Sequence, residues 1–227
     1  LLYPRIFDIV NRLAENGTSV VLGTNGTFLS ADNVSSLRKC TRVEISLDAA
    51  DPALNNQIRI SRSTGADAWK EAVAAMQVCL AANIRVRVLT ALNSINQHQL
   101  VELAALLHQI GIRDWAMSWT ISAGRAARIY DELRPDEAVV EQSLKRIREI
   151  YPTLAFRYSN RRAEEFNRFY FLVLPDGQIA TEDVVAGSKR TFGSALHIPL
   201  LSTWTSENFD LEAHFSKWVA NRLTGAA

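Results

Sequence analysis

The chain has 227 residues, of which 48% are hydrophobic and 22% charged, with 10 glycines and 6 prolines. This composition is typical of a globular protein and excludes collagen and a fully disordered chain. The formal net charge is only +1, so no global field would attract nucleic acid or an anionic membrane surface. Apolar runs such as 169–175 fall far short of the ~20 residues that span a bilayer, and the amino end shows no signal-peptide pattern. We therefore expect neither a nucleic-acid-binding protein nor a membrane protein.

The first 160 residues alternate between helix and strand patterns. Apolar residues at helical spacing predict helices at 3–16, 31–40, 69–83, 100–110 and from 135 to about 147. Short apolar runs predict strands at 19–22, 42–47, 84–91, 114–120 and 154–158. Strands separated by helices need crossover connections, so the sheet is expected to be parallel and covered by helices. The sequence thus predicts an α/β fold, which a doubly wound sheet or a barrel would satisfy.

The pattern changes near residue 160. A charged stretch at 157–168 is followed by two apolar runs, 169–174 and 178–181, on either side of Pro175-Asp176-Gly177. That turn sequence predicts a β-hairpin, and helical spacing returns at 209–223. We expect a main domain over residues 1–160 and a small α+β extension over residues 161–227.

The cysteines and histidines do not form a metal-binding pattern. Cys40 and Cys79 are the only two cysteines, too few for a disulfide framework, which favours a reducing compartment and a cytoplasmic protein. Cys79 falls on the apolar face of a predicted helix and Cys40 at a helix end, so both are interpreted as structural thiols. The histidines are dispersed without ligand spacing; they are His98, His108, His197 and His214. We expect no metal site within this chain.

Small polar residues follow four of the predicted strands. They lie at 23–27, at Ser46 and Asp48, at 90–93 and at 120–125. In parallel α/β folds, ligands bind outside the carboxyl ends of the strands, and hydroxyls, amides and a carboxylate at one rim suit a sugar hydroxyl or an amino-acid end. The same residue types are common turn formers. Only their coincidence at four strand ends indicates a binding site.

These strand ends also carry a resemblance to a known family. The matching pieces are residues 1–4 leading into a helix, 19–27, 43–48, the strand that ends in Asn93, and 124–126. In this order they resemble a radical S-adenosylmethionine (SAM) enzyme over residues 1–126. The resemblance implies a partial (β/α)6 TIM-like barrel, truncated here at its amino terminus. In that family a Gly-Gly-Glu-Pro-type segment precedes the stretch that resembles the start of this chain.

The resemblance also implies which residues contact SAM. Ser46 and Asp48 match positions that contact its carboxylate or ribose, and Asn93 matches a polar position on the next strand. Thr24 and Asn25 match the rim of the preceding strand.

Two further assignments follow from the same resemblance. Arg59 or Arg62 matches an arginine that pairs with the SAM carboxylate in some members, although a solvated loop arginine is an equally good interpretation. Ile121 and Ser122 lie where members use backbone groups to hold adenine.

The cofactors implied by the family are SAM and a [4Fe–4S] cluster held by three thiolates, usually in a Cys-x3-Cys-x2-Cys motif. This chain lacks that motif, so we expect both cofactors and an electron donor only in a full-length enzyme that starts a radical modification of a small molecule or peptide. The chain alone is expected to bind no cofactor and to be inactive. The extension is similar to the SPASM extension of peptide- and cofactor-maturing members, without its cysteines.

Two other functions fit the pattern less closely. One is an aldolase or isomerase on a (β/α) barrel, which would need a lysine or paired acids at the strand ends. The other is a metal-free binding module that uses the barrel rim.

Overall fold

The computed structural model describes residues 5–59, 67–122, 124–159, 172–183, 188–195 and 197. The chain forms two compact units. The first unit comprises residues 1–120 and 131–160, and the second comprises residues 121–130 and 161–227.

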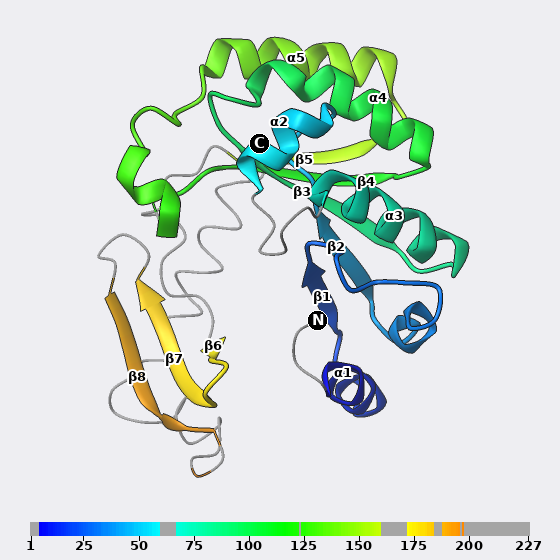
Figure 1. Cartoon of the computed structure of the whole chain (residues 1–227), viewed down its shortest axis with the longest axis vertical. Helices are drawn as coiled ribbons and strands as arrows, with labels where there is room; N and C mark the ends of the chain where they lie inside the picture. Colours follow the sequence, from blue (N-terminus) through cyan, green and yellow to red (C-terminus); the bar gives the residue numbers. More distant parts are fainter. Residues whose placement is uncertain are drawn as a thin grey trace. The chain divides into compact units, whose positions relative to one another are not determined.

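The first unit is built on a parallel sheet of five strands (Figure 1). The strands are β1 (Val21–Thr24), β2 (Arg42–Ser46), β3 (Val86–Leu92), β4 (Asp114–Trp119) and β5 (Ala155–Ser159). Their spatial order follows the chain, and every neighbouring pair is parallel. A doubly wound sheet reverses its strand order at a switch point, whereas consecutive order is that of a partial (β/α) barrel. The α/β prediction is therefore confirmed.

Helices alternate with the strands along the chain. They are α1 (Ile6–Glu15), α2 (Pro52–Ile58), α3 (Ala68–Ala81), α4 (Leu100–Ile110) and α5 (Glu137–Ile150), with short 3₁₀ helices η1 (Val34–Leu37) and η2 (Gln97–Gln99). Three helices begin at an aspartate whose carboxylate accepts a hydrogen bond from a backbone N–H of the first turn: Asp51, Asp67 and Asp136. None of the helices within the described residues is long and apolar enough to span a membrane.

The hydrophobic core lies between the sheet and the three long helices. Along β3 the residues alternate between buried and half-buried. Pairing in register places Val43 beside Val86 and Ile45 beside Val88 on the buried face. There they join one cluster with the apolar faces of α3, α4 and α5, represented by Met76, Leu103 and Ile147. The helices therefore cover one face and leave the other face of the sheet open to a different set of side chains.

The opposite face carries a ladder of charged side chains near the amino ends of the strands. Glu44 pairs in register with Arg87, and Arg87 with Asp114. The Arg87 guanidinium lies 2.6 Å from Asp114 and 3.4 Å from Glu44, while Arg42 lies 2.8 Å from Glu44. These contacts raise the pKa of Arg87, chiefly through its hydrogen bonds to Asp114. Near the amino ends of the strands, this face of the sheet is thus occupied by charged side chains that neutralise one another.

The described part of the second unit contains η3 (Gly124–Ile129) and an antiparallel sheet of β6 (Leu172–Val173), β7 (Gln178–Asp183) and β8 (Ser188–Ser194). The predicted hairpin across Pro175-Asp176-Gly177 is confirmed, and Gly177 has the positive φ of +81° that its turn requires. The strand β8 was not expected. The helix predicted at 209–223 lies outside the described residues.

Three details of the first unit differ from the sequence prediction. The helix expected at 31–40 is only the 3₁₀ turn η1, and the first strand begins at Val21 rather than residue 19. The helix α2 was missed. Its sequence is short and polar, but Asp51 caps it and Pro52 occupies its first position, where proline is favoured.

Candidate functional site

Asp48 is the centre of the candidate site, directly after β2. Its side chain is 2% exposed. One carboxylate oxygen, Oδ1, accepts a hydrogen bond of 2.8 Å from the backbone N–H of Ala91, at the end of the neighbouring strand. Burial raises the pKa of Asp48, and the opposing effects of Arg59 and the Ala91 N–H lower it. A buried carboxylate needs such partners to stay ionised.

Arg59 supplies the countercharge for Asp48. It lies at the carboxyl end of α2, and its Nε is 2.7 Å from Asp48 Oδ2 while its Nη2 donates to Oδ1 at 3.2 Å. The Nη2 contact is a hydrogen bond, whereas Nε lies at ion-pair distance from Oδ2 without hydrogen-bond geometry. The side chain is 28% exposed, so part of the guanidinium still faces outward. Arg59 is therefore held in place rather than free in solvent. Arg62, the alternative candidate, lies outside the described residues.

Asn93 and its neighbours close the loop after β3. Asn93 is buried, and its Oδ1 accepts hydrogen bonds from the backbone N–H groups of Ile95 and Asn96. Its Nδ2 donates to the carbonyl of Ala91 at 3.1 Å. These three bonds all go to backbone groups within three residues of Asn93. Asn93 thus shapes the rim beside Asp48 through local contacts.

Ser46, Asn25 and Thr24 occupy different parts of the sheet. Ser46 is half-buried and pairs in register with Leu89, on the face that the helices leave open. Asn25 follows β1, and its Oδ1 accepts from the Thr27 N–H. Thr24 pairs with Ile45 and therefore points to the helix-covered face, where its Oγ1 accepts from the Gly26 N–H. Of these, Ser46 shares the open face that leads to Asp48.

The Thr24 loop rests closely on α3. A Cβ atom added to Gly26 would lie 2.9 Å from the Cβ of Ala75 and 3.1 Å from the backbone of α3. Gly26 also has a positive φ of +93°. Beside it, Thr27 donates a hydrogen bond of 2.8 Å to Glu71 of α3. The loop is therefore fixed by helix packing, and glycine is required at its closest approach.

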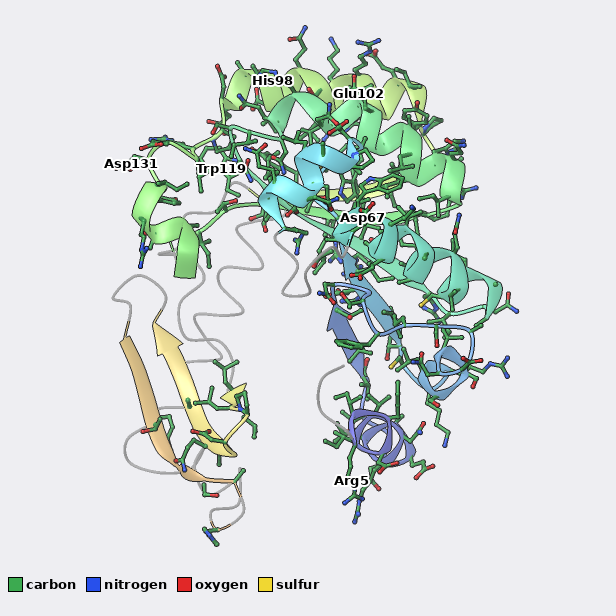
Figure 2. All side chains as sticks on the ribbon, in the orientation of Figure 1. Arg5, Asp67, His98, Glu102, Trp119 and Asp131 are labelled. Atoms are coloured by element: carbon green, nitrogen blue, oxygen red, sulfur yellow. The ribbon has the colours of Figure 1, made fainter. Side chains whose placement is uncertain are left out.

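Among the residues that Figure 2 labels are Asp67 at the start of α3, His98 in η2 and Trp119 at the end of β4. The Trp119 indole donates 2.8 Å to the hydroxyl of Tyr158 on β5. Arg134 stacks over the Trp119 ring at 5.9 Å from its centroid. These contacts fix the end of β4 by packing. Trp115, four residues earlier on the same strand, is fully buried in the core.

Several buried polar atoms lack a hydrogen-bond partner within the described residues. They are Asn55 Nδ2 on α2, Arg59 Nε after α2, Trp69 Nε1 at the start of α3 and Thr120 Oγ1 after β4. Asn55 accepts from the Asp48 N–H after β2, the Trp69 N–H donates to Asn56 on α2, and Thr120 directly follows β4. Unpaired donors and acceptors at a rim are what a polar ligand would satisfy. Ile121 and Ser122 belong to the second unit, where Ile121 is half-buried and Ser122 exposed.

The residues of this chain do not fit an iron–sulfur cluster. The sequence holds two cysteines where three thiolates are needed. Cys79 is buried in the core, and burial, with a smaller effect of nearby Cys40, raises its pKa to about 11. Metal ligation needs the thiolate. Within the part of the chain that the structure describes, no group of three histidine, cysteine, aspartate or glutamate residues could hold a metal ion.

Sequence reasoning missed two residues that surround Asp48. Asn55 is buried, and its Oδ1 accepts a 2.9 Å hydrogen bond from the backbone N–H of Asp48. Asn96 is also buried and donates to the Asp48 carbonyl. The Asn-x-x-Asn spacing of Asn93 and Asn96 was the only available signal, and it is common in turns.

Comparison with known families and structures identifies the fold. Residues 1–107 match the sequence model of the radical SAM superfamily. No curated protein sequence matches the chain.

Solved structures resemble the chain over most of its length. SuiB of Streptococcus suis superposes with a TM-score of 0.68 at 13% identity, covering 94% of this chain and 55% of SuiB. Native anSMEcpe with bound AdoMet gives a TM-score of 0.63 at 13% identity, covering 84% of this chain and 57% of that protein. A domain of pyruvate-formate lyase-activating enzyme from Bacteroides vulgatus gives 0.52 at 15% identity, covering 68% and 89%. The chain thus spans little more than half the length of SuiB and anSMEcpe.

Proposed function

On the premise that residues 1–107 of this chain belong to the radical SAM superfamily, we propose that the chain is the SAM-binding part of a longer radical SAM enzyme. The observation that carries the proposal is the buried Asp48–Arg59 pair at the carboxyl end of β2. A partly exposed guanidinium, held by a carboxylate behind it, presents its remaining N–H donors to an anionic group. The methionine carboxylate of SAM is such a group.

Other residues of the site suit the rest of a SAM molecule. Ser46 offers a hydroxyl on the open face two residues before Asp48. Asn55 Nδ2 and Thr120 Oγ1 are buried polar atoms without a partner in the described residues. SAM carries an ammonium, a carboxylate and ribose hydroxyls, so it can bind both hydrogen-bond donors and hydrogen-bond acceptors of the protein. The chain's own role is to bind and orient SAM at this rim.

The cluster itself would be held by residues outside this chain. When bound in the full-length protein, a [4Fe–4S] cluster supplies the electron that cleaves SAM, and an external electron donor reduces it. This chain alone is expected to leave SAM intact. The scarcity of cysteine favours a cytoplasmic protein.

A peptide is the substrate class that we favour. The fold similarity extends to SuiB bound to the precursor peptide SuiA and to anSMEcpe bound to the Kp18Cys peptide, with TM-scores of 0.68 and 0.62. An aldolase is less well supported, because no lysine stands at the carboxyl ends of the five described strands in the first unit. A metal-free binding module would bind a ligand at the same rim without cleaving it.

The test is a calorimetric SAM titration of the full-length protein, prepared anaerobically with its cluster. We expect Arg59→Met to weaken SAM binding about tenfold or more, the usual effect of losing a charged hydrogen bond. Arg42→Met is the matched control, because Arg42 is 30% exposed and pairs with Glu44 at the other end of the same strand. Equal affinity in the wild-type protein and Arg59→Met would remove the assignment. Binding without release of 5′-deoxyadenosine after reduction would indicate the binding module instead.

A further inference from the structure

The side chain of Asn96, in the loop before η2, is fully buried and uses all of its hydrogen-bonding groups on backbone atoms. Its Oδ1 accepts 2.8 Å from the N–H of Asn93. Its Nδ2 donates 2.9 Å to the carbonyl of Asp48 and 3.0 Å to the carbonyl of Ala91. Asn96 is 0% exposed, so water cannot replace these bonds. One amide group therefore ties together the ends of β2 and β3.

Both carbonyls that Asn96 binds belong to residues that fix the position of the Asp48 carboxylate. One is the carbonyl of Asp48 itself, and the other belongs to Ala91, whose N–H donates to Asp48 Oδ1. Strand pairing between β2 and β3 ends at Ser46 and Leu89. Beyond that point the Leu47 N–H still donates to the Leu89 carbonyl and the Thr90 hydroxyl to the Leu47 carbonyl, and the Asn96 amide extends this connection to Asp48. A change at Asn96 would displace the carboxylate and one of its donors together.

The same loop also holds the element that carries Arg59. Gln99, three residues after Asn96, accepts a 3.0 Å hydrogen bond at its Oε1 from the backbone N–H of Asp51. Asp51 is the N-cap of α2, and Arg59 lies at the other end of that helix. The segment from Asn93 to Gln99 thus contacts the backbone of Asp48 directly and the N-cap residue of the helix that ends before Arg59.

We propose that Asn96 is a positioning residue for the Asp48–Arg59 pair, and that it sets SAM affinity without touching SAM. This inference rests on the proposed function. Its geometric basis is the pair of hydrogen bonds from Nδ2 to the Asp48 and Ala91 carbonyls. Hydrogen bonds of this kind, made behind a binding group, hold that group within the narrow range of positions that its ligand requires.

The informative substitution is Asn96→Asp, which keeps an acceptor for the Asn93 N–H but removes both donated bonds. Asn33→Asp is the matched control. Asn33 also bridges a loop, with Oδ1 accepting from the Ser30 N–H and Nδ2 donating to the Phe28 carbonyl. Its contacts lie in the loop after β1 and do not include Asp48 or Arg59. A general effect of replacing a loop amide would appear in both variants.

The first measurement is a double-mutant cycle of SAM affinity in the full-length protein. We expect Asn96→Asp to weaken SAM binding about tenfold, and to have no further effect when Arg59→Met is already present. Asn33→Asp should bind SAM like the wild-type protein. Unchanged affinity in Asn96→Asp would overturn the inference. So would additive effects in the double variant, because Asn96 would then act independently of the pair.

The second measurement needs no SAM. The Nε–H resonance of Arg59 in ¹⁵N-labelled full-length protein should be protected from solvent exchange, since this atom is buried and lies 2.7 Å from Asp48 Oδ2. We expect Asn96→Asp to accelerate its exchange about tenfold or more and Asn33→Asp to leave it unchanged. Equal exchange in all three proteins would refute the positioning role. Absence of SAM binding in the wild-type protein, with this result intact, would refute only the proposed function.

Discussion

Replacing Arg59 with methionine should destabilise the first unit in a pH-dependent way. Methionine keeps most of the apolar stem but leaves Asp48, which is 2% exposed, without its countercharge. Breaking a buried ion pair from one side costs about 3–5 kcal/mol. Arg59 is partly exposed and the Ala91 N–H still binds Asp48, so we expect a loss of about 2–3 kcal/mol at about pH 8. With a urea dependence of about 2–3 kcal/mol per molar, the unfolding midpoint should fall by about 1 M.

The sign of the pH effect follows from the pKa of Asp48. Burial raises this pKa in the folded protein, and Arg59 opposes the rise. Stability from a raised carboxyl pKa is fully present below the unfolded value and is lost as the pH rises through the folded value. Removing Arg59 raises the folded pKa further, so the deficit of Arg59→Met should shrink from about pH 8 to about pH 5.

Urea unfolding followed by circular dichroism at the two pH values measures this difference. The double variant Asp48→Asn/Arg59→Met is the control, because it has no carboxylate to protonate and its deficit should be the same at both values. A deficit of Arg59→Met that does not change with pH, or that stays below about 0.5 kcal/mol, would refute the view that this ion pair keeps Asp48 charged.

Two further predictions concern packing and the core thiol. Gly26→Ala should lower the free energy of unfolding by about 2–3 kcal/mol, because the new Cβ would lie 2.9 Å from the Cβ of Ala75. The control Gly17→Ala has a similar positive φ but open space around it, so it should lose only about 1 kcal/mol. Equal losses in thermal unfolding would show that the close approach to Ala75 is unimportant. Cys79, with its pKa raised to about 11, should react with a thiol reagent at about pH 8 more slowly than half-buried Cys40, as peptide mapping would show; faster labelling of Cys79 would contradict its place in the core.

Much of the fold was predictable because its strands follow simple patterns. The apolar run around Val86 predicted β3 to within two residues, and Gly111 correctly marked the end of α4. The helix α2 was not predictable from periodicity, since seven residues with a polar centre show no apolar face. Its signal was the cap, Asp51-Pro52, which is also a common turn sequence.

The site was predictable only in part. Sequence reasoning placed Ser46 and Asp48 at a strand end, and the structure has both there. It could not decide whether Arg59 is paired or solvated, because the pairing with Asp48 forms only when α2 folds and brings the two residues together. Asn96 was missed for a different reason. Its role comes from two backbone carbonyls that the folded sheet brings to it, and nothing local in the sequence distinguishes it from an ordinary turn residue.

The charged ladder of Glu44, Arg87 and Asp114 also determines how the strands can align. Side chains alternate between the two faces, so sliding β3 by one residue would turn the Arg87 guanidinium toward the helices and into the apolar layer around Val43. That misaligned sheet would bury the Arg87 cation without a partner and leave the Glu44 and Asp114 carboxylates without their countercharge. The ladder therefore penalises slipped pairings, and loops at the far ends of the strands can change in sequence while the alignment of the sheet is kept.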